Sequence, residues 1–69
     1  MKIINKQDLI NLGFPKHTAQ NIIRQAKFNM IQQGYAIYNN KRLGQVPIQS
    51  VEAILGFSLS NNNEESNNG

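Results

Sequence analysis

The side chains best suited to recognition lie in a stretch of the chain without acidic residues, between Asp8 and Glu52. Within it, residues 16–27 supply arginine, which pairs with guanine edges, and asparagine and glutamine, which pair with adenine. A solvated helix of this length usually mixes charges of both signs. The pattern therefore favours a polyanionic ligand over the alternative of an ordinary solvated face. The candidate DNA contacts are Lys16, His17, Thr18, Gln20, Asn21, Arg24 and Lys27.

A second candidate contact region is the turn sequence Asn39-Asn40-Lys41-Arg42, which places two cations at a chain reversal. Asparagine tolerates the backbone angles of tight turns. Cations at the tip of such a turn suit contacts to phosphates or to the minor groove. The alternative is a plain hairpin turn whose charges protect a strand edge. We take Asn40, Lys41 and Arg42 as the second set of candidate DNA contacts.

The sequence has few side chains suited to catalysis or to metal binding. The chain has one histidine, His17, and no cysteine, so a metal site lacks ligands. Asp8 and Glu52 are isolated carboxylates in separate predicted helices. A tyrosine nucleophile would need a surrounding set of Arg and His side chains, which a chain with one histidine cannot supply. We expect no catalytic residue, no metal and no cofactor, and hence no enzyme.

A short first helix should begin after Asn5 and end near Gly13. Asn5 can accept a backbone N–H at the helix start, and Asp8 at the third helical position suits the positive helix end. Gly13 is suited to a left-handed terminating position. The apolar side of this helix is Leu9, Ile10 and Leu12.

A long second helix should open near Pro15, where the missing N–H is tolerated. Its apolar residues recur at helical spacing and form one stripe. Phe28 and Ile31 fall on the opposite side, so the C-terminal half of the helix should have nearly two apolar faces. We expect the segment after Gly34 to cover Phe28 and bury it. The stripe is Ala19, Ile22, Ile23, Ala26 and Met30.

Beyond Gly34, residues 35–38 and 43–46 predict a β-hairpin, with Tyr35 and Tyr38 on one side of the first strand. Pro47 should start a third helix, Ile48–Leu55, with Val51, Ile54 and Leu55 facing inward and Gly56 as its stop. Phe57 and Leu59 could fold back onto the core.

The predicted fold class is mainly α with a small hairpin. It is a winged helix-turn-helix in the order helix, turn, long helix, hairpin wing, short helix. We expect a domain over residues 1–59 and a disordered tail over 60–69.

Length and charge agree with one small basic domain. The chain has 69 residues, a formal net charge of +3 and a pI of about 9.6. All seven lysines and arginines lie between Lys2 and Arg42, whereas Glu64 and Glu65 lie in the tail. A basic domain attracts polyanions, most often nucleic acid, although solubility alone is an alternative. The N-terminus lacks an apolar run suited to a signal peptide or membrane span, so we expect a cytoplasmic protein without membrane contact.

Two runs carry a family resemblance: GFPKHTAQNIIRQAK over residues 13–27 and GYAIYNNKRLGQVPIQSVEAILG over 34–56. The chain, over about residues 6–56, resembles a small uncharacterised family encoded beside integrase genes in conjugative elements and phages of Gram-positive bacteria. The order of parts is also similar to excisionase and MerR-type winged helix-turn-helix proteins, although the second helix here is longer than their usual recognition helix.

These resemblances imply an accessory DNA-binding protein of site-specific recombination that bends DNA near attachment sites and steers an integrase toward excision. The implied partners are double-stranded DNA and a site-specific integrase, with weak self-association on DNA as a further expectation. Two alternatives stay open on the residues alone. One is a protein-interaction module that contacts the integrase and touches DNA little, and the other is a small transcriptional repressor.

Overall fold

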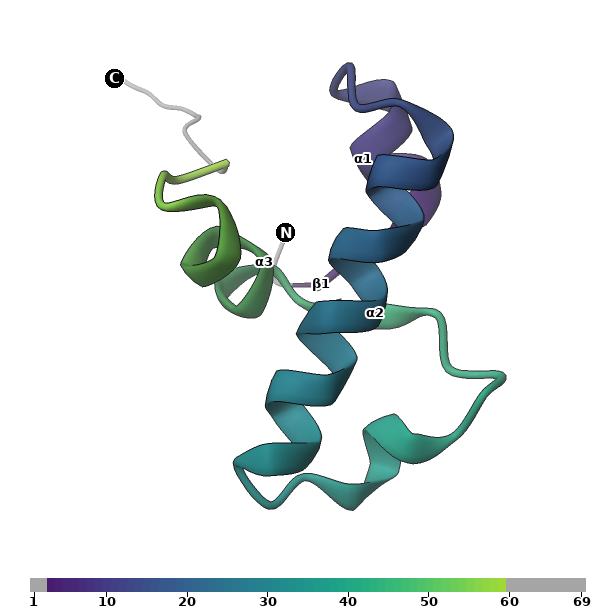
Figure 1. Cartoon of the computed structure of the whole chain (residues 1–69), viewed down its shortest axis with the longest axis vertical. Coiled ribbons are helices and arrows are strands. Elements are labelled where there is room, and N and C mark those ends of the chain that lie inside the picture. Colours follow the sequence, from purple (N-terminus) through teal and green to yellow (C-terminus); the bar gives the residue numbers. More distant parts are fainter. Residues whose placement is uncertain (1–2, 60–69) are drawn as a thin grey trace.

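A computed structural model describes residues 3–59, in which three α-helices surround a two-stranded sheet (Figure 1). The helix α2 runs along the long axis of the molecule, and α3 and the segment before β2 lie on different sides of it. This order confirms a mainly helical domain with a small sheet. The predicted tail, residues 60–69, lies outside the described residues. The elements are β1 (Ile3–Asn5), α1 (Lys6–Asn11), α2 (Lys16–Gln32), a 3₁₀ helix η1 (Ala36–Asn39), β2 (Gln45–Pro47) and α3 (Ile48–Leu55).

Both ends of α1 are fixed by local hydrogen bonds. The Asn5 side chain accepts from the Asp8 backbone N–H at 2.8 Å, and the Asp8 carboxylate accepts from the Asn5 backbone N–H at 2.9 Å. This reciprocal pair is a capping box. At the other end, Gly13 has a φ of +112° and its N–H donates to the Ile10 carbonyl, while the Phe14 N–H donates to the Leu9 carbonyl. These two bonds form a Schellman motif, so both predicted ends of α1 are confirmed.

The capping box makes Asn5 a determinant of stability. Asn5→Ala removes the side-chain acceptor for the Asp8 N–H, and we expect it to lower the free energy of unfolding by about 0.5–2 kcal/mol. Urea denaturation followed by circular dichroism measures the loss. The matched control is Asn11→Ala, because the Asn11 side chain is exposed and only accepts from Gln7 one turn earlier. That variant should stay within about 0.5 kcal/mol of wild type; equal losses in the two variants would contradict the capping role.

The helix α2 follows Pro15 directly and buries its predicted stripe. Ala19, Ile22, Ile23 and Ala26 are all buried, and Met30 is half-buried. The helix ends in a second Schellman motif, in which the N–H groups of residues 34 and 35 donate to the carbonyls of residues 31 and 30. The glycine at position 34 takes a φ of +102°, which explains the residue type there.

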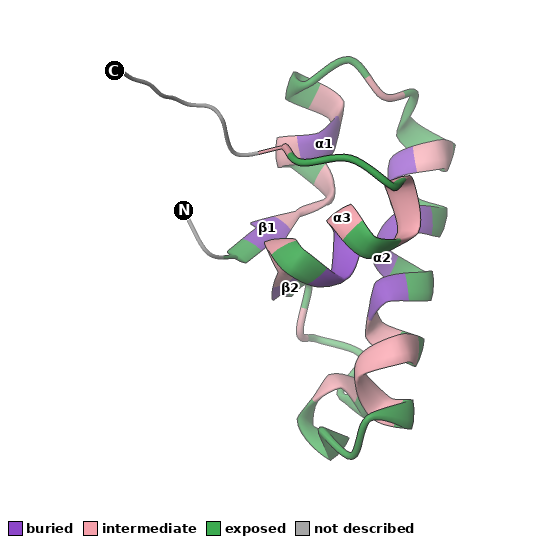
Figure 2. Cartoon of the chain, turned by 90° about the vertical axis from the view of Figure 1, so that its left-hand side faces the viewer, coloured by how far each residue is buried: buried purple, intermediate pink, exposed green. Residues whose placement is uncertain are grey.

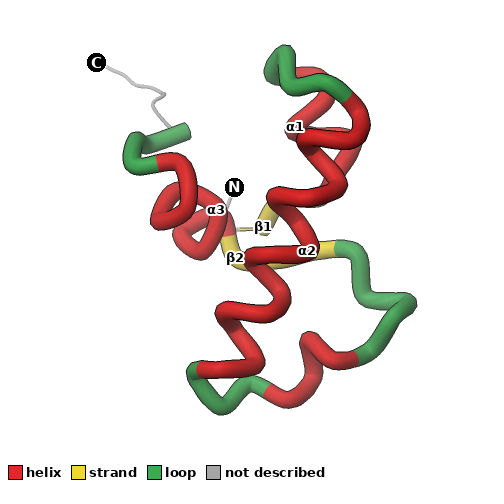
Figure 3. The backbone as a smooth tube through the Cα atoms, viewed as in Figure 1, coloured by secondary structure: helices red, strands yellow, loops and turns green. Residues whose placement is uncertain are grey.

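The predicted hairpin between residues 35–38 and 43–46 is wrong. Residues 36–39 form η1, and β2 pairs instead with β1, antiparallel, with Ile4 opposite Val46 (Figure 3). The turn at the end of α2 carries the chain straight into η1, which packs along the C-terminal half of α2. Tyr38 packs against the core from there, whereas Tyr35 remains 53% exposed, so the two tyrosines do not share a side.

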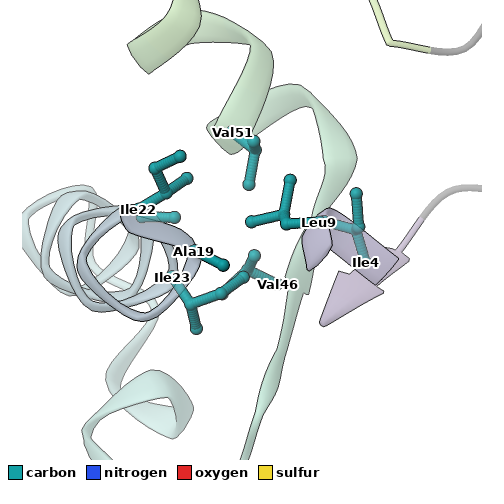
Figure 4. Close-up of a cluster of buried hydrophobic side chains, with 8 residues drawn as sticks. Ile4, Leu9, Ala19, Ile22, Ile23, Val46 and Val51 are labelled. Atoms are coloured by element: carbon teal, nitrogen blue, oxygen red, sulfur yellow. The ribbon is translucent and has the colours of Figure 1, made fainter. Parts of the chain in front are cut away.

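The core lies where the small sheet, α1, α3 and the N-terminal and middle turns of α2 meet (Figure 4). Leu9, Val46 and Val51 are fully buried. They come from α1, β2 and α3, so the core joins elements far apart in the sequence. The buried apolar residues of the described chain are Ile4, Leu9, Ala19, Ile22, Ile23, Ala26, Val46 and Val51.

The C-terminal half of α2 is covered less than its apolar residues suggested. In Figure 2 the buried positions of α2 are confined to its N-terminal and middle turns. Phe28 is 54% exposed, so the expectation that it anchors a hairpin is wrong. The helix η1 has only four residues, and its Ile37 is itself 65% exposed. It therefore does not cover Phe28.

The third helix has the predicted bounds. Pro47 precedes α3, Val51 is buried, Ile54 and Leu55 are half-buried, and Gly56 ends the helix with a φ of +83°. The chain then folds back: the Leu59 N–H donates to the Glu52 carboxylate at 2.7 Å, and the Leu59 side chain packs on the core. Phe57, the other residue expected to return to the core, is 56% exposed.

Within residues 3–59, none of the helices has the length and apolar composition that crossing a membrane requires.

Candidate nucleic-acid interface

A tight turn over residues 40–43 presents the two cations of the second candidate region. The Asn40 side chain accepts from the Arg42 N–H at 2.9 Å, and the Asn40 carbonyl accepts from the Leu43 N–H at 3.1 Å. These bonds form an Asx turn within a β-turn. Lys41 and Arg42 occupy its two central positions and are exposed. The cations are therefore displayed as expected, although the turn does not join two paired strands.

A hydrogen bond from Lys27 connects this turn to α2. The Lys27 ammonium donates to the Asn40 carbonyl oxygen at 2.9 Å, across 13 residues of sequence. The bond satisfies a carbonyl and leaves the positive charge unneutralised, because the acceptor is not a carboxylate. The position of the cationic turn relative to α2 is thus set by a residue of the helix itself.

Between α2 and the turn lies a groove of about 530 Å³, which we call the basic groove. Four cations line it, from α1, α2 and the turn: Lys6, Arg24, Lys27 and Lys41. Its apolar lining is Ile23, Phe28, Ile31, Tyr38 and Leu43, and its remaining lining residues are Gln20, Asn39 and Gly44.

No carboxylate is among the described residues that line the basic groove. The two acidic residues of the described part of the chain are both engaged elsewhere. Asp8 belongs to the capping box of α1, and Glu52 accepts hydrogen bonds from Leu59 and Ser58 beside α3. The positive potential of the groove therefore has no acidic neighbour on its own walls, which favours an anionic ligand.

An exposed row of side chains runs along α2 beside the groove, and we call it the α2 ridge. Its members follow helical spacing of four, three and four residues, so they lie above one another on one side of the helix. All of them are exposed. The ridge consists of His17, Asn21, Arg24 and Phe28. Arg24 and Phe28 belong to both the ridge and the groove, so the two surfaces are continuous.

Residues 2–59 match the model of a family described as a domain of unknown function, DUF3173. This chain belongs to the DUF3173 family. None of the curated proteins and none of the solved structures matches it. The family description states no activity, so the function must be argued from the surface of this DUF3173 domain.

The fold of the DUF3173 domain brings together part of the predicted contact set. Gln20, Arg24, Lys27 and Lys41 share the basic groove. The other predicted contacts fall into two groups. On or near the exposed face, outside the groove lining, lie Lys16, His17, Asn21, Asn40 and Arg42. Thr18 is half-buried, and at 100° per residue its position on α2 is turned about 120° from Arg24.

Lys6 and Phe28 are two of the groove residues that the sequence did not indicate as contacts. Asn5 pairs with Gln45, so the β1–β2 register carries Lys6 and Gly44 to the same groove. That pairing joins segments 40 residues apart and has no local signal. Phe28 did carry a signal, since it interrupts the polar side of α2, but that pattern by itself predicts burial under a neighbouring segment.

Proposed function

We propose that this DUF3173 domain binds double-stranded DNA in a sequence-specific manner. The observation that carries the proposal is the basic groove, in which four cations and no carboxylate of the described chain line a channel between a helix and a turn. Such a channel has the charge required to hold one phosphodiester strand. The α2 ridge beside it offers Asn21 and Arg24 to base edges.

The proposed arrangement is a variant of the winged helix-turn-helix. Helix α2 would enter the major groove, α1 would cross behind it, and one DNA backbone would pass through the basic groove. Residues 36–44, which are η1 and the turn, would act as the wing in place of a hairpin. Lys41 and Arg42 would then meet phosphates on the far side of that backbone.

The biological role we propose is that of an excisionase-like accessory factor of a mobile element. This role rests on the resemblance of the sequence to proteins encoded beside integrases and on the charge and exposure of the basic groove and the α2 ridge. A small transcriptional repressor would use the same surface and would differ in the location of its site. Footprinting on the attachment region and on the promoter of the element distinguishes the two roles.

A protein-interaction module that contacts the integrase is the second candidate. It is favoured by the exposed apolar side chains near the C-terminal end of α2, where Phe28, Tyr35 and Ile37 are 54%, 53% and 65% exposed. Exposed apolar side chains that gather in a patch commonly mark protein interfaces. A complex with the element's integrase that forms by gel filtration without DNA, together with no duplex binding, would support this candidate over the first.

Binding to duplex DNA across a salt series tests the proposal directly. Duplexes selected from a random library give the site, and fluorescence anisotropy gives Kd. If Lys6, Lys27, Lys41 and Arg42 each neutralise one phosphate, the slope of log K against log salt should be about −3.6, and affinity should fall roughly 150-fold between 50 and 200 mM salt. A domain that shifts no duplex at 50 mM salt would contradict the proposal.

The turn has its own prediction. Replacing both Lys41 and Arg42 with alanine should weaken binding to all duplexes about equally and change the salt slope from about −3.6 to about −1.8, because two phosphate contacts are lost. Both side chains are exposed, so the thermal melt should be unchanged. An unchanged slope would mean that the turn does not touch DNA, and a loss confined to some sequences would place Arg42 in the minor groove.

A further inference from the structure

Phe28 is an exposed apolar side chain beside the cations of the basic groove. It is the last member of the α2 ridge, it lines the basic groove, and it is 54% exposed. Ile31 and Tyr38, both half-buried, line the same groove. Phe28 is therefore the exposed edge of an apolar groove wall that is surrounded by cations.

The place of Phe28 on α2 fixes what it could reach if the ridge faces DNA. It follows Arg24 by four residues, which is one turn and about 6 Å along the helix axis. Base pairs are stacked 3.4 Å apart, so the Phe28 ring would meet a base pair about two steps from the one that Arg24 reads. A helix that brings Arg24 to a base edge thus brings Phe28 into the same major groove.

The chemistry of the major groove leaves one match for an aromatic ring that cannot form hydrogen bonds. Donors and acceptors occupy the base edges there, and the apolar exception is the C5-methyl group of thymine. We infer that Phe28 determines specificity by packing against a thymine methyl group, about two base pairs from the contact of Arg24. This inference rests on the proposed function and adds a base preference to it.

Replacing thymine with uracil tests the contact, because uracil lacks only the methyl group. Each thymine of the selected duplex is replaced in turn, and Kd is measured with the full chain. Wild type should lose roughly fourfold in affinity at one position, as expected for one buried methyl group. Phe28→Ala should bind the thymine duplex roughly fourfold or more weakly, and it should no longer distinguish thymine from uracil at that position.

Phe57→Ala is the matched control, because Phe57 is exposed to a similar extent, 56%, but follows α3 and does not line the basic groove. It should keep the full preference for thymine. Thermal melts of both variants check that they are folded.

If wild type binds duplex DNA but no uracil substitution changes its affinity, or if Phe28→Ala keeps the preference for thymine, the inference is overturned and the proposed function stands. If wild type binds no duplex, both are overturned. A Phe28→Ala domain that binds duplexes like wild type but no longer forms a complex with an integrase would instead assign Phe28 to a protein interface.

Discussion

Leu9→Ala should lower the free energy of unfolding by about 2–5 kcal/mol. Leu9 is fully buried, with no exposed surface, and it comes from α1, packs in the core with Val46 of β2 and Val51 of α3, and lies beside the buried face of α2 (Figure 4). Alanine at this position loses the apolar transfer energy of the leucine side chain and leaves a cavity where α1, β2 and α3 meet. A domain of this size has a total stability of roughly 3–10 kcal/mol. The substitution should therefore unfold a large fraction of the molecules.

Leu12→Ala is the control for this expectation, since it makes the same chemical change at the end of the same helix. Leu12 is 55% exposed, so its loss should cost less than about 1 kcal/mol. Urea denaturation of both variants, followed by circular dichroism, gives the two free energies. Similar losses, or a larger loss for Leu12→Ala, would mean that α1 does not bury Leu9 as described.

The features that could be predicted from the sequence are those fixed within a few residues. The Asn5 and Asp8 pair predicts the start of α1 because both partners lie in one helical turn. Gly13 and Gly56 predict helix ends because each takes a positive φ that other residues avoid. Pro47 likewise predicts the start of α3. The buried stripe of α2 followed from its spacing alone.

The pairing of the strands could not be predicted in the same way. Each strand has three residues, too few for an alternating pattern to stand out from its surroundings. The β-forming composition of residues 35–38 was outweighed by the Schellman turn at Gly34, which directs the chain back along α2 as η1. The partner of β2 and the place of η1 both depend on contacts between elements that are distant in the sequence or folded back on one another.

The same distinction between local and tertiary features applies to the candidate site. The polar side of α2 and the display of Lys41 and Arg42 followed from helix periodicity and turn chemistry. The groove between them did not, because it depends on η1 and on the Lys27 to Asn40 hydrogen bond. Phe28, which was expected to be buried under the segment after Gly34, is exposed instead. In physical terms, the sequence indicates which face of an element is polar, whereas the groove requires knowledge of which elements meet.

Arg24→Ala and Asn21→Ala should each weaken binding to the selected duplex by about 1–3 kcal/mol, and each should relax the preference at one base position. Both residues lie on the exposed α2 ridge, and Arg24 also lines the basic groove, where no carboxylate of the described chain competes for it. Arginine can form two hydrogen bonds to a guanine edge and asparagine two to an adenine edge, so each loss should depend on sequence and not only on charge.

Gln49→Ala is the matched control, because Gln49 also carries an exposed amide side chain but lies on α3. It belongs neither to the α2 ridge nor to the lining of the basic groove. That variant should bind like wild type, and all three should melt alike. Anisotropy titrations against the selected duplex and against duplexes altered at single positions separate the outcomes. If Arg24→Ala and Asn21→Ala bind every duplex as wild type does, α2 is not the reading helix. If both lose affinity equally for all duplexes, the ridge contacts phosphates, and the specificity of this domain must come from the deformability of its DNA site.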